Sequence, residues 1–597
     1  MGTGHTGSGI RIVAARVRNF RALQQVDVSL GDLTVLVGEN NAGKTSFIEA
    51  LYAAIGAGRR TMSEDDVFLA PTEKRAPKNR VVAIDLLIRP TDDGGLTVPS
   101  FPTGYWLSLW GNGVSQDDAD NDFVAIRTRM AWDNTQGEYV VERVFLGDWQ
   151  TDPGKWELSK AKGPVSYAQI EPLALYLMDA KRDIQDEFSS RSSFWHKLVY
   201  DPGLTDDQIE EMEKILSQVN ERILSYSDVL SHVQDHLDEL YDTINCEPGS
   251  VSISPVARHL RDMNRGVDVA IATRGAQSFP LVRQGMGTRS LTAVLVFRAY
   301  TSWRQKCAKS SLIHPMLALE EPETHLHPQA QRALFRLVSR ITGQRIISTH
   351  SPYIAGQAPI DSLRHFRKVG PCTEVTSIDI SQLSDDDRRK IERMVLNTRG
   401  DLIYARALVI CSGETEEQAL PVFGAKYWGR QPNDLGITMV GVGGDGSYVP
   451  FLRLAHQFAI PWYIFSDGEK SAIDSVNRAM EVVGEPLTSP RLFIIPDGKS
   501  FEKYVATNES QDALINMAIS LDAVNDFHKK ALKKEWDSKG DPLSELVLYL
   551  EHNKTRYARP LAEAITELLQ EELRFPLKVR AMFEMITRDL KMDGRTS

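Results

Sequence analysis

The chain has 597 residues, enough for about four domains at the ~150 residues of a typical domain. Its 42% hydrophobic and 25% charged residues are ordinary for a globular protein. The 69 Lys and Arg residues against 80 Asp and Glu residues give a net charge of −11. This charge excludes a protein that coats nucleic acid by bulk positive charge, although a local basic channel is compatible with it.

The hydrophobic pattern predicts alternating regions of structure along the chain. Residues 10–55 alternate like strands and then form a Gly-rich turn and an apolar helix. Residues 80–175 contain short β-rich runs separated by Gly, Asp, Asn and Pro. Residues 186–245 have apolar side chains at three- and four-residue spacing, which predicts a charged helical hairpin. The hairpin is either a dimerisation arm or an amphipathic pair of helices packed on its own domain. Helix and strand alternate over 285–355 and about 403–510, before a mostly helical tail.

The strongest local signal is GENNAGKT, residues 38–45, which fits the phosphate-binding pattern G-x-x-x-x-G-K-[ST]. It follows the apolar strand 33–37 and opens a helix, as this pattern requires. Backbone N–H groups of such a turn cradle phosphates at the helix N-terminus. We therefore expect ATP here, with Lys44 at the β- and γ-phosphates and the Thr45 hydroxyl on Mg²⁺. The nucleotide-binding residues of this segment are expected to be Gly38, Asn40, Asn41, Gly43, Lys44 and Thr45.

Two further apolar strands end in residues suited to ATP hydrolysis. Strand 316–319 ends in Glu320 and Glu321, the place for a carboxylate that supports the metal ion and for one that orients the attacking water. The strand in RIISTHSP ends in His350, which we interpret as a switch histidine near the γ-phosphate.

The C-terminal part carries carboxylates at the ends of three apolar strands. Glu416 follows strand 408–411, Asp467 and Glu469 follow a second strand, and Glu502 follows a third. Because parallel strands place their carboxyl ends at one sheet edge, we expect these four carboxylates to form one acidic site. Such hard oxygen ligands suit Mg²⁺ or Mn²⁺, and paired metal ions stabilise the attacking and leaving oxygens of a phosphodiester.

Four cysteines without any CxxC pair argue against a disulfide framework or a zinc cluster, and they suit a reducing cytoplasm. The sequence has no apolar run of about 18 residues, so we expect no membrane span and a cytoplasmic location.

Three segments, in this order, resemble the ABC-type ATPases of the branch that contains SMC and RecF-like repair proteins: GENNAGKT, LEEPETHLHP and STHSP. The resemblance places Glu320 at the Walker B aspartate and Glu321 at the catalytic glutamate. It also makes VRQGMGTRSLTAVL the signature loop, with Gly285, Gly287 and Arg289–Ser290, in wording that differs from LSGGQ.

The stretch YLMDAKRD resembles the Y-x-x-A-x-R-D segment of one subgroup of these ATPases. In that subgroup it follows the β-rich insert. The match makes Arg182 either a phosphate or interface contact or a surface salt-bridge residue.

The C-terminal half resembles a TOPRIM domain, the metal-dependent fold of topoisomerases, primases and some nucleases. An ABC ATPase followed by TOPRIM resembles the OLD (overcoming lysogenization defect) family, which includes the Gabija antiphage nuclease subunit. The family pattern consists of E-G-x-x-E, D-x-D, a following acid and a downstream lysine. Gly413 and Glu416 match the first part, and Asp467 and Glu469 stand at the two acids of D-x-D. Glu502 matches the following acid, and Lys554 matches the lysine. The resemblance implies that Lys554 neutralises charge that develops on the phosphate.

Ser412 stands where that family has the first glutamate of E-G-x-x-E. A serine is neither a charged metal ligand nor a strong general base. Either the neighbouring Glu414 substitutes for it, or one metal site is weak or absent and cleavage is slow, partner-dependent or lost.

The predicted fold class is α/β: an ABC-type ATPase domain with β-rich and helical inserts, followed by a Rossmann-like TOPRIM domain with a helical tail. The expected domains are the N-terminal ATPase part with the β-rich insert, a helical dimerisation arm, the C-terminal ATPase part, and the TOPRIM domain with its tail. Their ranges are 1–185, 186–250, 251–400 and 401–597.

The resemblance implies an ATP-binding, Mg²⁺- or Mn²⁺-dependent DNA endonuclease or nickase that acts in bacterial antiphage defence, with cleavage gated by the ATPase. It also implies a homodimer or higher homo-oligomer, a local basic channel for DNA, and a helicase or other defence-system partner. Two alternatives stay open. One is an ATP-dependent DNA-binding sensor or clamp whose TOPRIM domain does not cut, and the other is an effector that acts on RNA or on a partner protein.

Overall fold

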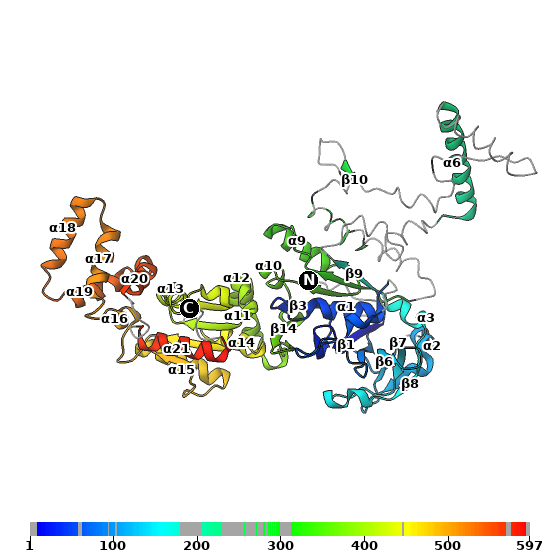
Figure 1. The fold of residues 1–597 in the computed structure, drawn as a ribbon, viewed down its shortest axis with the longest axis horizontal. Helices are drawn as coiled ribbons and strands as arrows, with labels where there is room; N and C mark the ends of the chain where they lie inside the picture. The colour runs from blue at the N-terminus through cyan, green and yellow to red at the C-terminus, as the bar shows by residue number, and fades with distance from the viewer. Residues whose placement is uncertain are drawn as a thin grey trace, which may run out of the picture. The chain divides into compact units, whose positions relative to one another are not determined.

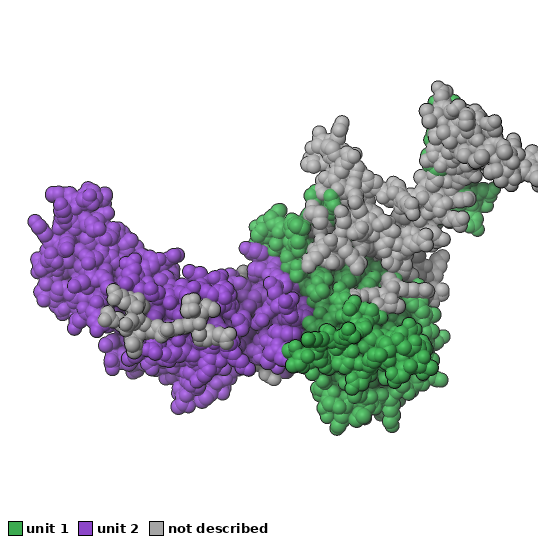
Figure 2. Space-filling view, viewed as in Figure 1, with its two compact units in different colours: residues 1–34, 45–348 green, residues 35–44, 349–597 purple. Residues whose placement is uncertain are grey.

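The computed structural model describes residues 9–57, 62–92, 95–101, 104–179, 204–227, 312–443, 447–568 and 575–592, and isolated positions between 256 and 298. The chain divides into two compact units (Figure 2). Unit 1 consists of residues 1–34 and 45–348, and unit 2 consists of residues 35–44 and 349–597.

Unit 1 contains an antiparallel sheet with the strand order β2-β1-β4-β6-β7-β8, drawn in blue and cyan in Figure 1. A short strand, β5, also pairs with β6. The strands are β1 (Ile10–Phe20), β2 (Leu23–Ser29), β4 (Val82–Pro90), β5 (Val114–Gln116), β6 (Asp122–Asp133), β7 (Glu138–Leu146) and β8 (Ala161–Pro164). The alternate residues Val82, Ile84, Leu86 and Ile88 of β4 are fully buried, so they form the core face of this sheet.

Three parallel strands of unit 1 pair in the order β13-β12-β9. They are β9 (Leu175–Asp179), β12 (Met316–Glu320) and β13 (Gln344–Ser348), and the helices α1 (Lys44–Ile55) and α9 (Pro328–Val338) belong to the same α/β region. The buried side chain of Gln344 donates to the carbonyl of Ile12 and accepts from its N–H, at 2.9 and 2.8 Å. This amide therefore ties β13 to β1 and joins the parallel strands to the antiparallel sheet.

Unit 2 contains a second set of parallel strands, in the order β17-β16-β18-β19. They are β16 (Ala407–Cys411), β17 (Ile437–Gly441), β18 (Trp462–Ser466) and β19 (Leu492–Ile494). Every residue of β16 and β18 is buried, as expected for central strands covered on both faces. The same unit holds residues 35–38 of β3 (Leu33–Gly38), which pair in parallel with β14 (Leu363–Val369).

Helices cover and extend the parallel sheet of unit 2. Those next to the sheet are α13 (Glu414–Trp428), α14 (Val449–Gln457), α15 (Lys470–Val483), α16 (Phe501–Val505) and α21 (Leu577–Asp589). The tail contains α17 (Gln511–Asp522), α18 (Asp526–Asp537), α19 (Pro542–His552) and α20 (Lys554–Leu568). The predicted α/β fold class, with a helical tail, is confirmed.

The predicted helical arm is described only in part. Helix α6 (Asp206–Tyr226) begins at Thr205, whose side chain accepts the N–H of Gln208 while the Gln208 side chain accepts the N–H of Thr205. The helix confirms the helical pattern over these residues, and the rest of the arm lies outside the described residues. Its role in dimerisation stays a prediction.

No helix in the described part of the chain is long and apolar enough to cross a lipid bilayer.

Candidate functional site

The side chain of Lys44 folds onto the loop that precedes it. Its Nζ donates hydrogen bonds to the carbonyl oxygens of Gly38, at 2.8 Å, and Glu39, at 2.7 Å. Gly38 and Gly43 have φ values of +127° and +99°, a conformation open to glycine. A Cβ at Gly38 would stand 1.9 Å from the carbonyl oxygen of Phe366, so no other residue fits there. The loop thus has the glycine geometry that the phosphate-binding pattern requires.

The two side chains expected to support Mg²⁺ at the nucleotide are in contact. Thr45 Oγ1 donates a hydrogen bond to Glu320 Oε1, although the two residues are far apart in the sequence. Glu320 is the last residue of β12, so the buried strand Met316–Leu319 delivers its carboxylate to the start of α1. A hydroxyl and a carboxylate in this arrangement fit a magnesium ion bound to ATP.

Glu321 has a φ of +43°, which is a strained conformation for a residue with a side chain. Its N–H donates to the carbonyl of Ser348 at 3.0 Å, and its own carbonyl accepts the N–H of Thr324 at 3.1 Å. These bonds hold the strained turn directly after β12. Such strain is concentrated at functional sites, where it aims a side chain that regular structure would point elsewhere.

His350 lies in the loop that leads into the short helix α10 (Pro352–Ala355), and it is partly exposed. The N–H of Thr349 donates to the carbonyl of Leu36 in β3 at 3.1 Å, so this loop runs beside the strand that leads into the phosphate loop. The His350 ring is 6.1 Å from the ring of Tyr404. The position of His350 relative to a γ-phosphate stays a prediction.

The predicted signature loop is described only at single positions. The N–H of Arg289 donates to the carbonyl of Gly285 at 3.2 Å, which is the spacing of one helical turn. A Cβ at Gly287 would stand 2.8 Å from Leu326 Cδ2, so glycine permits close packing on the turn after β12. Ser290 lies outside the described residues, as does Arg182.

Three of the four predicted acidic residues lie at one edge of the parallel sheet in unit 2. Ser412 follows β16, and its Oγ donates to Glu416 Oε1 at 2.7 Å and accepts the N–H of Asp467 at 3.2 Å. Thr415 donates to Glu502 Oε1 at 3.1 Å. Since Thr415 and Glu416 are neighbours at the start of α13, these bonds connect Glu416, Asp467 and Glu502. We call Ser412 and these three residues the acidic cluster.

The two glutamates of the acidic cluster are almost completely buried. Glu416 is 2% exposed and Glu502 is 1% exposed. Nearby, burial raises the pKa of the Tyr448 hydroxyl, and the negative charges of Glu416 and Asp467 raise it further. Burial likewise raises the pKa of the Cys411 thiol, with added effects of Glu416 and Glu417. The carboxylates of Glu416 and Asp467 therefore add negative charge at this edge of the sheet, which favours a bound cation.

Glu469 and Glu414 do not contact the acidic cluster. Glu469 is exposed at the residue that precedes α15. Glu414 is exposed and accepts a hydrogen bond from Gln418 Nε2 at 3.2 Å. Ser412, rather than Glu414, thus faces the carboxylates. Lys554 is the first residue of α20, and its side chain lies outside what is described.

The described residues contain no group of three or more His, Cys, Asp or Glu side chains that could hold a metal ion. The chemistry of the donors nevertheless fits Mg²⁺ or Mn²⁺, because carboxylate oxygens are the ligands that these ions take.

Sequence reasoning missed a set of residues that follow the ATPase part and contact both sites. Arg406 Nε forms an ion pair of 3.9 Å with Glu39 Oε1 of the phosphate loop. Arg399 Nη1 pairs with Glu417 Oε1 at 2.5 Å, next to Glu416. Arg399, in the short helix α12 (Asn397–Arg399), and Arg406, just before β16, carry no local signal for a role, because only the tertiary fold brings them to these glutamates.

Comparison with known proteins agrees with these two regions. A family model described as an AAA ATPase domain matches residues 11–93 and 153–355. A model of the TOPRIM domain of proteins like the overcoming lysogenization defect protein matches residues 403–468.

Two curated proteins are similar over most of the chain. A protein named OLD nuclease from Thermus scotoductus is 23% identical over 493 residues, which cover 77% of this chain and 82% of that protein. The Old nuclease of Escherichia phage P2 is 21% identical over 492 residues, which cover 77% of each. The chain belongs to the OLD family, with an ATPase domain followed by an OLD-like TOPRIM domain.

Proposed function

We propose that this protein is an ATP-gated, metal-dependent DNA endonuclease or nickase. The observation that carries the proposal is the acidic cluster at the edge of a parallel sheet, in which the hydroxyls of Ser412 and Thr415 bind the carboxylates of Glu416 and Glu502, and Ser412 also binds the backbone N–H of Asp467. The relatives named OLD nuclease and Old nuclease support the assignment. The family also supports a role in antiphage defence, a homo-oligomeric assembly and a helicase or other defence-system partner.

At the acidic cluster, Glu416, Asp467 and Glu502 would hold Mg²⁺ or Mn²⁺, while Glu469 lies exposed outside the cluster. Such an ion lowers the pKa of bound water and stabilises charge on a phosphodiester. Ser412 orients Glu416 through its hydroxyl and fixes the backbone at Asp467. The family pattern supports a role for Lys554 in neutralising negative charge on the phosphate.

At the phosphate loop, backbone groups from Gly38 to Gly43, including Asn40 and Asn41, would cradle the phosphates of ATP. Lys44 is held at this loop by two carbonyls and would turn to the β- and γ-phosphates. Thr45 and Glu320 already contact each other and would hold Mg²⁺. Glu321, in its strained turn, would orient the attacking water, and His350 would sense the γ-phosphate.

The segment 399–406 supplies a route by which ATP gates cleavage. At one end Arg406 pairs with Glu39 of the phosphate loop. Tyr404 donates long hydrogen bonds of 3.4 Å to the carbonyls of Thr349 and Ser351, which flank the proposed switch histidine. At the other end Arg399 pairs with Glu417, in the helical turn that carries Glu416. A change at the phosphate loop would therefore reach the acidic cluster through contacts within one unit.

One observation favours a second function, an ATP-dependent DNA-binding sensor whose TOPRIM domain does not cut. Ser412 occupies the place of a family glutamate and contacts the acidic cluster, while Glu414 is exposed and contacts Gln418. This leaves one carboxylate fewer for metal ions.

Lys44→Ala tests the ATP site. The substitution removes the ammonium group proposed to bind the phosphates, so ATP binding measured by titration calorimetry should weaken by about tenfold or more. Lys426→Ala removes an exposed lysine of α13 and should bind ATP like the parent protein. Equal ATP affinity in the Lys44 variant would contradict the assignment.

Asp467→Ala tests the nuclease assignment. Plasmid nicking in Mg²⁺ or Mn²⁺ should fall by about a hundredfold or more, because the substitution removes a proposed metal ligand. Asp474→Ala, an exposed aspartate on α15, is the matched control and should cut normally. Full cleavage by the Asp467 variant, or no cleavage by the parent in any metal and nucleotide condition, would contradict the function.

Ser412→Glu separates the nuclease from the non-cutting sensor, and Ser412→Asp repeats the test with a shorter side chain. If the natural protein is the sensor, the restored carboxylate should create cleavage that the parent lacks. Measurable nicking by the parent protein would reject the sensor.

Arg406→Gln tests gating. Removal of the ion pair with Glu39 should bring the ratio of cleavage with and without ATP close to one, while ATP binding itself changes little. Arg430→Gln, an exposed arginine after α13, should keep the parent ratio. An unchanged ratio in the Arg406 variant would rule out this route.

A further inference from the structure

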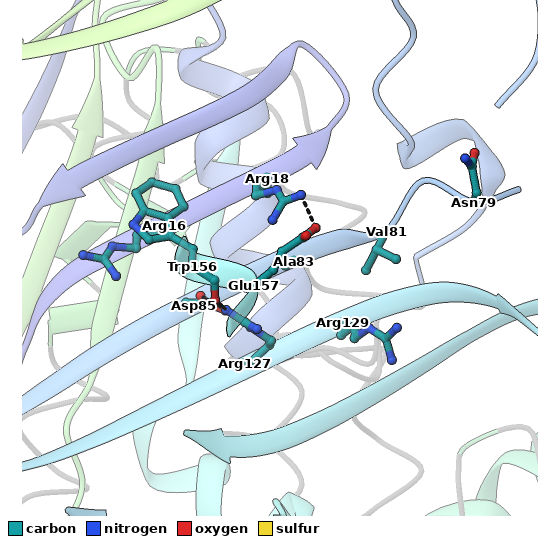
Figure 3. Close-up of a pocket in the computed structure, with 10 residues that line it drawn as sticks. All are labelled: Arg16, Arg18, Asn79, Val81, Ala83, Asp85, Arg127, Arg129, Trp156 and Glu157. Atoms are coloured by element: carbon teal, nitrogen blue, oxygen red, sulfur yellow. Dashed lines mark hydrogen bonds and ion pairs between the residues drawn. The ribbon is translucent and has the colours of Figure 1, made fainter. Parts of the chain in front are cut away.

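A cavity of about 420 Å³ opens on one face of the antiparallel sheet of unit 1 (Figure 3). This volume is within the range of pockets that bind small ligands. Four arginines line it, two from β1 and two from β6: Arg16, Arg18, Arg127 and Arg129. Neither the phosphate loop nor the acidic cluster uses any of these residues. This concentration of guanidinium groups stands out in a chain whose net charge is −11.

The strand register arranges these arginines in two rows. Across β1, β4 and β6, Arg16 lies opposite Asp85, which lies opposite Arg127, and we call this the paired row. Two residues along the strands, Arg18 lies opposite Ala83, which lies opposite Arg129, and we call this the open row. Residues two apart on a strand point to the same face, so both rows face the cavity.

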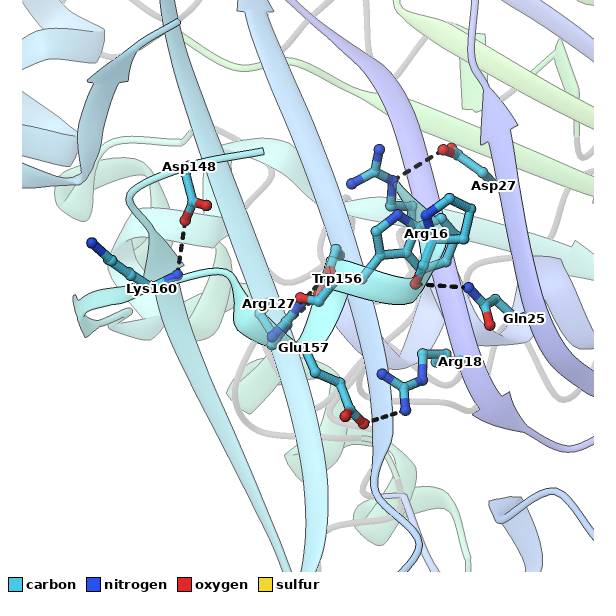
Figure 4. A network of polar contacts seen from close by, with 11 residues as sticks. Arg16, Arg18, Gln25, Asp27, Arg127, Asp148, Trp156, Glu157 and Lys160 are labelled. Carbon is cyan, nitrogen blue, oxygen red and sulfur yellow. Dashed lines mark hydrogen bonds and ion pairs between the residues drawn. The ribbon is translucent and has the colours of Figure 1, made fainter. Parts of the chain in front are cut away.

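Both arginines of the paired row have acidic partners, and Figure 4 shows Arg16 with Asp27. Arg127 binds Asp85 through two hydrogen bonds of 2.7 Å and donates a third, also 2.7 Å, to the carbonyl of Trp156. Arg16 Nε donates to Asp27 at 3.0 Å, and its guanidinium lies 3.8 Å from the ring centroid of Trp149 and 4.7 Å from that of Trp156. These groups pin the turn η3 (Pro153–Leu158) onto the sheet, so their role is structural.

The open row differs because its central residue is small and its ion pairs are exposed. Ala83 leaves a hollow between Arg18 and Arg129, whose strands are two sheet spacings, or roughly 10 Å, apart. Arg18 pairs with Glu157, and Arg129 pairs with Glu142 at 2.7 Å. The two glutamate side chains are 62% and 51% exposed. Exposed ion pairs of this kind contribute little, so a doubly charged anion can replace the carboxylates.

A buried donor lies at the same cavity. The indole Nε1–H of Trp156 has no hydrogen-bond acceptor among the described residues, and Trp156 is 3% exposed. A buried N–H without an acceptor is destabilising, so an acceptor oxygen that reached it would be favoured. The exposed amide of Asn79 adds a further donor at the rim.

We propose that the open row, with Arg18 and Arg129 on either side of Ala83, binds a phosphate group. Guanidinium groups match the oxygens of carboxylate and of phosphate with two parallel hydrogen bonds, and the second negative charge of a phosphate favours it over the single charge of an exposed carboxylate. The phosphate belongs either to a nucleic-acid backbone or to a free nucleotide, and both present the same chemistry to the site. The site is separate from the ATP and acidic sites and does not depend on their proposed functions.

The test uses the full chain with Lys44→Ala, so that the phosphate loop does not contribute. Calorimetric titrations use three probes: inorganic phosphate, thymidine 5′-monophosphate, and a duplex oligonucleotide with 5′-hydroxyl ends. The double substitution Arg18→Gln with Arg129→Gln should weaken binding by about tenfold or more. Arg75→Gln, an exposed arginine outside the cavity, is the matched control and should bind like the parent.

The competing carboxylates give a test in the opposite direction. Glu142→Gln should tighten phosphate binding by about threefold or more, because Arg129 then loses its internal partner. A purely structural ion pair would not produce this gain, and the result does not depend on whether the double variant folds. Binding of phosphate and of the nucleotide identifies a free ligand, and binding of the duplex alone identifies a nucleic-acid backbone. No binding of any probe at millimolar concentration, or equal binding by parent, double and Glu142 variants, would overturn the proposal.

Discussion

The hydroxyl of Ser412 is the contact on which the C-terminal site depends. Ser412 follows β16, and its hydroxyl accepts the backbone N–H of Asp467, which follows the adjacent strand β18. The hydroxyl therefore joins the ends of two parallel strands. It also donates to Glu416, which is 2% exposed. A buried carboxylate is stable only when donors satisfy it, and a glutamate in place of Ser412 would bring a further negative charge. The serine therefore stabilises the cluster and reduces its charge at the same position.

The segment 399–406 contacts both the phosphate loop and the helix that carries Glu416, all within unit 2. Residues 38–44 of the phosphate loop and the loop that holds His350 belong to the same compact unit as the TOPRIM sheet. Arg406 and Arg399 pair with glutamates at either end of this segment, beside the ATP and acidic sites. The ion pairs are partly exposed, so each is weak on its own. Weak contacts suit a gate, because a modest change in free energy is enough to shift them.

The antiparallel sheet uses arginine in two ways within one cavity. In the paired row, burial and bidentate bonds make Arg127 and Asp85 a structural pair that loses stability if either partner is removed. In the open row, solvent weakens the same kind of pair and leaves guanidinium groups that an outside anion can reach. The difference arises from the rings of Trp149 and Trp156, which lie against Arg16 of the paired row.

The sequence by itself determined the α/β class, the glycine-rich phosphate loop and the carboxylates at strand ends, because strand periodicity and turn glycines are local properties. It also raised the question of Ser412 against Glu414. Only the tertiary structure decided that Ser412 faces the acidic cluster, that Thr45 meets Glu320, and that Arg406 meets Glu39. The arginine rows were likewise invisible, because β1, β4 and β6 are separated in the sequence and their register is set by pairing in space.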